Sequence, residues 1–175
     1  NDRLFVRREG GRVKARGIPK LPRINPGTIV HNPALHALIE PKRREELLTL
    51  PKQELWHLEE KYDVMIKAVY GAGRIEEEMT LDAFLVLNWS HETTDATALV
   101  EVDLPSRSDL LPAIMKSPGP FFQYADGRMF EDVMQPEPAA YLDALQGVVM
   151  LEARGKVDIP FLTGELHKWV TTCQA

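Results

Sequence analysis

Hydrophobic and polar positions alternate first in two short segments near the start of the chain. The run LFV at 4–6 and the segment 12–18 predict two strands, and Gly10-Gly11 between them predicts a tight hairpin turn. The prolines within 19–26 then predict an extended or looping connection. The chain is therefore expected to open with a β-hairpin followed by an irregular connection.

Three helical segments follow the hairpin, and a proline stands near the start of each. Asn32-Pro33 predicts an N-cap with proline at the first helical position, and further helices are predicted to begin at Pro41 and Pro51. Leucines recur within each segment at helical spacing, so each helix has one apolar side to bury.

The second half of the chain alternates between apolar runs and amphipathic stretches. Strands are predicted over 64–70, 81–89, 98–104 and 148–152. The run LDAFLVLNW at 81–89 is nearly continuous in apolar residues, which predicts a strand covered on both faces.

Helices are predicted between and after these strands. Ser106 with Asp109 resembles a capping box, 138–145 is amphipathic, and Asp158 is placed to cap a last helix. An aromatic loop at 118–127 separates two of the elements. This alternation predicts an α/β fold with a mixed β-sheet and flanking helices, formed by residues 1–175 as a single domain.

Composition supports a globular α/β domain. Of the 175 residues, 44% are hydrophobic and 27% are charged, and no apolar stretch approaches the ~18 residues that cross a bilayer. The first residues are polar and basic, unlike a signal peptide. Cys173 is the single cysteine, so a reducing compartment, and hence a cytoplasmic location, is expected.

Charge is distributed unevenly around a net value of −5. Residues 1–24 hold eight Lys and Arg against Asp2 and Glu9, a net charge of +6, so the other residues carry −11. This asymmetry fits either a segment that meets an anion or a solvated hairpin with a basic outer face. The acidic balance of the whole chain and the lack of interleaved aromatic residues disfavour nucleic acid as the partner.

Motifs for phosphate or metal binding are weak. A P-loop needs G-x-x-x-x-G-K-[ST], and at Gly155-Lys156 the hydroxyl residue is replaced by Val157 and the first glycine by Met150. The cluster of His91, Glu92 and Asp95 fits either a metal site or a polar loop.

The first part of the chain resembles a known family. The segments NDRLFV at 1–6, RGIPK at 16–20 and RINPGTI at 23–29 resemble the HPr-kinase-related kinases, bacterial relatives of HPr kinase/phosphorylase with a fold similar to phosphoenolpyruvate carboxykinase. In that family a P-loop and its helix come first. A strand then ends in an acidic pair, and a hairpin leads to an Arg-Gly motif. The resemblance covers about the first 30 residues and is vaguer over 81–104. It implies that this chain is the C-terminal part of a larger kinase domain whose P-loop lies upstream of residue 1.

The resemblance also implies roles for individual residues. Asp2 matches the second acid of the pair and would be a catalytic Mg²⁺ ligand. Arg16, which with Gly17 matches the Arg-Gly motif, would be the other catalytic residue. Asn1 stands where the family has an aspartate proposed as general base, and Lys14 stands where it has an acid two places before the arginine. The remaining basic residues suited to phosphate contacts are Arg3, Lys20 and Arg23.

The expected function is phosphoryl transfer from ATP, with Mg²⁺, to an unknown protein or small molecule. Without the P-loop, this chain alone is expected neither to bind ATP tightly nor to turn over. The alternative is a non-catalytic binding or regulatory domain that keeps the kinase-like fold, which Asn1 and Lys14 favour. A nucleic-acid binder with a basic edge is a third hypothesis. Relatives of HPr kinase assemble, so the loop at Phe121-Phe122 fits either an oligomer interface or a core contact.

Overall fold

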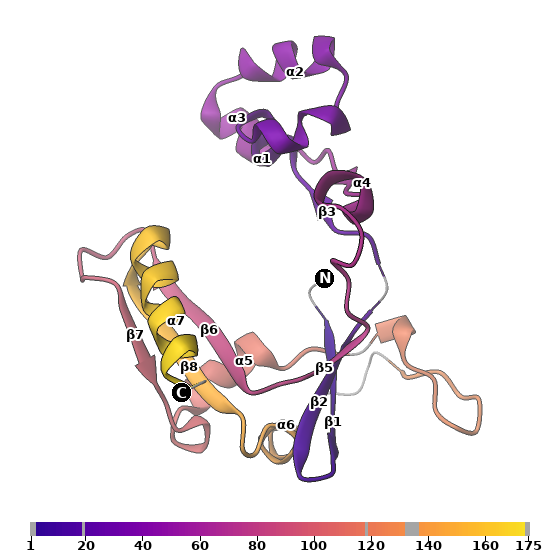
Figure 1. Ribbon diagram of the computed structural model, residues 1–175, viewed down its shortest axis with the longest axis vertical. Helices are drawn as coiled ribbons and strands as arrows, with labels where there is room; N and C mark the ends of the chain where they lie inside the picture. Colours follow the sequence, from indigo (N-terminus) through magenta and orange to yellow (C-terminus); the bar gives the residue numbers. More distant parts are fainter. Residues whose placement is uncertain (1–2, 19, 118, 132–136, 174–175) are drawn as a thin grey trace. The chain divides into compact units, whose positions relative to one another are not determined.

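The chain forms a mixed α/β fold in a computed structural model, with three small sheets and flanking helices (Figure 1). The structure describes residues 3–18, 20–117, 119–131 and 137–173. These residues divide into two compact units, one containing 17–77 and the other 3–16 together with 78–173. The predicted mixed α/β class is confirmed. That 1–175 are one domain within a larger kinase domain stays a prediction.

The unit containing 17–77 is largely helical. Its helices are α1 (Pro26–Val30), the 3₁₀ helix η1 (Pro33–Leu38), α2 (Pro41–Leu48), α3 (Lys52–His57) and α4 (Ile66–Tyr70). Strands β3 (Arg23–Ile24) and β4 (Tyr62–Asp63) pair antiparallel. The hydrophobic core cluster of this unit consists of the buried residues Ile29, Val30, Leu35, Ile39, Leu47 and Leu55.

The starts of η1, α2 and α3 follow the sequence prediction, whereas α1 was not predicted and α4 was predicted as a strand. Asn32 caps η1, since its side-chain oxygen accepts a hydrogen bond from the Ala34 N–H at 3.1 Å. The strand predicted over 64–70 is wrong, because this segment forms helix α4. Ile66 and Val69 lie three residues apart, and Val69 packs against the unit's core, so the run buries one helical side. Gly71 follows α4 with φ of 88°, a conformation that favours glycine.

The other unit opens with a three-stranded sheet. Strands β1 (Leu4–Glu9), β2 (Arg12–Gly17) and β5 (Glu78–Thr80) lie in the order β1-β2-β5. Gly10 and Gly11 have φ of 58° and 77°, and positive values at both central residues are what a two-residue hairpin turn requires. The predicted hairpin is confirmed.

A second sheet of the same unit has the order β6-β8-β7. Strands β6 (Ala83–Ser90) and β8 (Val149–Lys156) are parallel, and β7 (Ala98–Glu101) is antiparallel to β8. The predicted mixed sheet is therefore present. Helix α7 (Ile159–Cys173) follows β8, and the Phe161 N–H donates to Asp158 Oδ1 at 3.0 Å, so Asp158 caps α7 as predicted.

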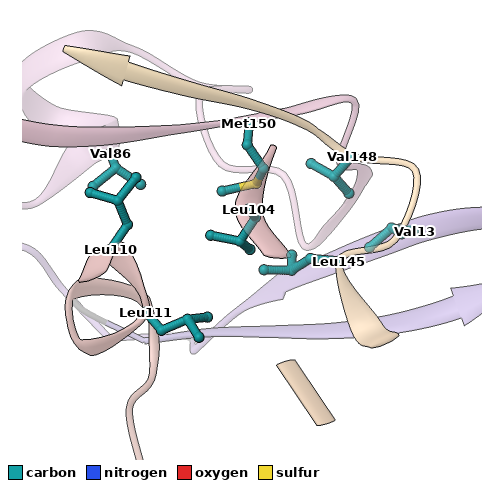
Figure 2. Close-up of a cluster of buried hydrophobic side chains, with 8 residues drawn as sticks. All are labelled: Val13, Val86, Leu104, Leu110, Leu111, Leu145, Val148 and Met150. Carbon is teal, nitrogen blue, oxygen red and sulfur yellow. The ribbon is translucent and has the colours of Figure 1, made fainter. Parts of the chain in front are cut away.

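Short helices link the strands and close the core of this unit. They are η2 (Leu104–Ser106), η3 (Ser108–Leu110), α5 (Leu111–Ile114), η4 (Gly119–Phe121) and α6 (Pro138–Ala144). Figure 2 shows the buried side chains gathered into one cluster, which joins β2, β6 and β8 to these short helices. The cluster consists of Val13, Val86, Leu104, Leu110, Leu111, Leu145, Val148 and Met150.

Two sequence predictions fail in this unit. Strand β6 is not covered on both faces, since Val86 is buried while Leu87 is 54% exposed. Ser106 does not form a capping box, because its hydroxyl donates to the Asp103 carboxylate and the chain turns there through η2 and η3. In the described part of the chain, no helix is long and apolar enough to cross a membrane.

Candidate functional site

The outer face of the β1-β2-β5 sheet carries a concentration of basic side chains. Along β2, Val13 and Ala15 are buried, and strand alternation therefore directs Arg12, Lys14 and Arg16 to the opposite side. Arg12 and Arg16 are exposed, and Lys14 is half-buried. This surface, with Arg7 and the carboxylates described next, is called the basic face.

Strand β5 supplies the neighbours of these cations. Glu78 lies opposite Arg16 in the register and Thr80 lies opposite Lys14. The Lys14 ammonium donates to Thr80 Oγ1 at 3.2 Å. This hydrogen bond holds the lysine nitrogen over the sheet rather than in free solvent.

Arg7 brings two carboxylates to the basic face. Its guanidinium lies 3.0 Å from Glu9 Oε2 and 3.1 Å from Glu78 Oε2. Exposed pairs of this kind contribute little to stability. Their effect is on local charge, since two carboxylates offset two of the four cations.

Arg12 and Arg16 are exposed cations of the basic face without a carboxylate partner, whereas Lys14 is bonded to a neutral hydroxyl. Neither arginine makes a hydrogen bond or ion pair with any residue that the structure describes. An exposed guanidinium offers donors in a planar fork that matches phosphate or carboxylate oxygens. Chemically, the face can hold an anion by charge and hydrogen bonding.

Arg3, which was predicted to contact phosphate, is placed differently. Its Nε donates to the Ser117 carbonyl oxygen at 2.9 Å, and its guanidinium carbon lies 5.7 Å from the centre of the Phe121 ring. The side chain thereby fastens β1 to the segment around η4. These contacts give Arg3 a structural role, and its predicted phosphate contact stays a prediction.

The other predicted site residues are divided between the two units. Arg16 belongs to the unit with the basic face, whereas Lys20 and Arg23 belong to the helical unit. Arg23 Nε lies 3.5 Å from Asp63 Oδ1 in the β3–β4 pair, and Lys20 is exposed. Asp2, the predicted metal ligand, lies outside the described residues, as does Asn1.

The aromatic loop that follows η4 packs beside the hairpin. The Phe122 ring lies 6.2 Å from that of Phe5 and makes edge contacts with Tyr124 at 5.2 Å and Phe130 at 6.5 Å. Phe121 and Phe122 nevertheless stay partly exposed. The loop thus contacts the hairpin through Phe5, and whether it forms an oligomer interface stays a prediction.

Gly155-Lys156 is confirmed not to be a phosphate loop. Both residues lie inside β8, and the Lys156 N–H donates to the Asp95 carbonyl at 2.9 Å. Gly155 has φ of 88°, and a Cβ there would lie 2.2 Å from the Ala96 carbonyl oxygen. The glycine is required by a close approach of two backbone segments.

The polar loop that follows β6 is held by its own hydroxyls. The Glu92 N–H donates to Ser90 Oγ at 3.1 Å and the Asp95 N–H donates to Thr93 Oγ1 at 3.2 Å. Across the described residues, no group of three or more His, Cys, Asp or Glu side chains is arranged to hold a metal ion. The polar-loop interpretation of this segment is therefore the one that the geometry supports.

Sequence reasoning missed a buried ion pair in the second sheet. Glu152 on β8 is 1% exposed, accepts from Arg107 at 2.6 and 2.9 Å, and accepts from Asn88 Nδ2 at 2.7 Å. Hydrogen bonds from Arg107 hold the pKa of this carboxyl below its ordinary value, against the opposing effect of burial. Glu152 stands inside an apolar run of the sequence, where only its isolation among hydrophobic residues could have marked it.

A second ionic cluster lies in the helical unit. Arg43 Nη2 is 2.7 Å from Glu60 Oε2, and the Tyr62 hydroxyl donates to the same carboxylate. The hydrogen bond from Arg43 lowers the pKa of Glu60. Because each group already has a partner, this cluster joins α2 to β4 and leaves no group free for chemistry.

Comparison of the chain with protein-family models, curated proteins and solved structures gives no match.

Proposed function

We propose that this chain is the C-terminal part of an HPr-kinase-related kinase, and that its basic face contributes cationic groups to a site for a phosphate-bearing ligand. The observation that carries the proposal is the placement of Arg16. It belongs to the Arg-Gly pair of the resemblance, and it projects from the end of β2 on the same side as Arg12 and Lys14. It has no intramolecular partner among the described residues.

Phosphoryl transfer suits such a face because catalysis depends on positioning and on neutralising charge. The exposed guanidinium of Arg16 can pair with phosphate oxygens, and Lys14 adds a point charge beside it. The resemblance implies that ATP and Mg²⁺ bind in the parent protein, with Asp2 as a metal ligand. Bound Mg²⁺ would neutralise charge on the phosphates. The phosphoryl acceptor, a protein or a small molecule, is left open.

A non-catalytic binding domain is the second candidate, and the position of Lys14 favours it. The family carries an acid where this chain has a lysine, and here the lysine nitrogen is bonded to Thr80 on the sheet surface. A cation at this point strengthens anion binding but cannot accept a proton. Such a protein would hold a phosphate-bearing ligand without transferring the phosphoryl group.

The first experiment is calorimetric titration with ATP and Mg²⁺, on this chain and on a version extended upstream through any P-loop. The kinase proposal expects binding by the extended form only. If neither form binds, the kinase proposal is wrong and the binding domain is the better account.

The role of the basic face is tested separately with inorganic tripolyphosphate. We expect the Arg12→Ala, Lys14→Ala, Arg16→Ala triple variant to bind it at least about tenfold more weakly than the wild type. The matched control changes Lys42, Lys52 and Lys67, three exposed lysines of the helical unit, to alanine. An equal loss in both triple variants would show that net charge, and not the basic face, governs the affinity.

A further inference from the structure

Strand β6 lies at an edge of its sheet. In the order β6-β8-β7, one side of β6 pairs with β8, and no strand in the described part of the chain pairs with the other side. The strand is eight residues long and reads AFLVLNWS, without one charged side chain. Long, uncharged edges of this kind pair readily with further strands, and proteins usually protect them with lysine, proline or a bulge.

The backbone groups on the open side can be assigned from one hydrogen bond. The Val149 N–H donates to the Asp82 carbonyl oxygen at 3.0 Å, so the peptide groups of Asp82 point toward β8. In a parallel ladder this direction alternates along the strand. The residues whose N–H and C=O groups point away from β8 are therefore Ala83, Leu85, Leu87 and Trp89.

Three of these residues also carry apolar side chains on one face. Leu85, Leu87 and Trp89 lie opposite Leu151, Ala153 and Gly155 of β8, on the face away from Val86. Helix α7 contacts β7 of the same sheet. On β6, Leu85 and Trp89 are partly buried. Leu87 is 54% exposed although it stands in the middle of a strand.

We propose that β6 pairs antiparallel with β6 of a second copy of this chain, which joins two three-stranded sheets into one of six strands. A two-fold axis perpendicular to the sheet passes beside Leu87. Side chains that lie opposite each other must share a face, and placing Leu87 opposite Leu87 of the second copy meets this condition. Leu85 then lies opposite Trp89, and the outward peptide groups exchange hydrogen bonds in pairs.

A second copy is favoured as the partner because the strand is complementary to itself. An interface with two-fold symmetry places the same surface against itself, so any charged residue near the axis would meet its own charge. Strand β6 has none. Leu85, Leu87 and Trp89 are also among the residues whose N–H and C=O groups point away from β8. The same residues therefore supply both the hydrogen bonds and the apolar contacts of the pairing. The pairing is independent of the basic face, which lies on the other sheet.

The test is sedimentation equilibrium across protein concentrations. We expect the wild type to dimerise and Leu87→Lys to raise the dissociation constant at least about tenfold, since two lysines would lie opposite each other. Leu48→Lys is the control, because Leu48 is 52% exposed, on α2. An equimolar mixture of Leu87→Lys and Leu87→Glu should restore the dimer. Circular dichroism checks that each variant is folded.

The register is tested by cross-linking in a Cys173→Ser background, which removes the single native cysteine. Leu87→Cys should form an intermolecular disulfide, because opposite Cα atoms in such a pair lie ~5.5 Å apart. Asn88→Cys, one residue further along, should not. The proposal is overturned by a wild type that stays monomeric up to about 1 mM, by a dimer that Leu87→Lys leaves unchanged, or by cross-linking through Asn88→Cys instead.

Discussion

Arg107 and Glu152 form a bidentate salt bridge that joins the turn after β7 to the middle of the second sheet. The guanidinium nitrogens lie 2.6 and 2.9 Å from the two carboxylate oxygens, and the carboxylate is 1% exposed. Arg107 also reaches Asp109 with two hydrogen bonds of 2.9 Å. The arginine therefore fixes η3 against β8 while it compensates a carboxylate that has no access to water.

Replacing Glu152 by glutamine should destabilise the unit although the side chain keeps its size. The amide is uncharged and replaces one acceptor oxygen with a donor NH₂ group, which faces Arg107 in either orientation and Asn88 as well in one of them. Hydrogen bonds to charged groups contribute ~1.5–3 kcal/mol, so we expect a loss of about 2 kcal/mol in the free energy of unfolding. Urea denaturation at neutral pH measures it. Glu101→Gln, an exposed change on β7, serves as the control and should be close to neutral.

The same carboxylate predicts a pH dependence of stability. The pKa of Glu152 is lowered in the folded state by hydrogen bonds from Arg107, so the unfolded chain binds a proton at higher pH than the folded one. The stabilisation is present above the ordinary glutamate pKa of about 4.3 and is lost as pH falls through the folded value. The stability difference between wild type and Glu152→Gln should therefore shrink on acidification from pH ~5. A constant difference down to pH ~3 would contradict this linkage.

Gly155 should tolerate no side chain. A Cβ there would meet the Ala96 carbonyl oxygen at 2.2 Å, and φ is 88°, so Gly155→Ala combines a clash with backbone strain. We expect a loss of at least about 2 kcal/mol in the free energy of unfolding. Gly164→Ala is the opposite case, because Gly164 lies within α7 with open space around its Cα, and it should stabilise by ~0.5–1 kcal/mol. Thermal denaturation should give a lower melting temperature for Gly155→Ala and a higher one for Gly164→Ala, each relative to the wild type.

Local signals in the sequence were enough to predict the elements that local chemistry controls. Gly10-Gly11 identified the first hairpin, and Asp158 marked the start of α7 through a cap that the structure contains. The segment 64–70 failed because a five-residue helix shows less than two turns of periodicity, so its apolar residues fit a strand equally well. Short apolar runs are decided by packing, which the sequence does not display.

Features that depend on distant partners could not be predicted. The burial of Glu152 requires Arg107, 45 residues away, to be brought against the same strand. Leu87 is exposed in the folded sheet, whereas the run of apolar residues alone predicted a strand covered on both faces. For the candidate site, the charge of residues 1–24 indicated either an anion-binding segment or a hairpin with a basic outer face, but the pairing of Arg7 with Glu78 arises only when β5 joins the sheet.

Removing a carboxylate from the basic face should strengthen anion binding. Glu78 lies opposite Arg16 and pairs with Arg7, so Glu78→Gln raises the net charge of the face by one, while Arg7 keeps its pair with Glu9. One added unit of charge at ~4 Å is worth about 1 kcal/mol in bulk water, so the dissociation constant for tripolyphosphate should fall roughly threefold to fivefold at low salt. The control is Glu76→Gln, an exposed residue before β5 that makes the same change in net charge. Calorimetry should show tighter binding in the first variant alone. An equal increase in affinity for tripolyphosphate in both variants would mean that the affinity depends on the net charge of the whole molecule, and that the basic face is not the binding site.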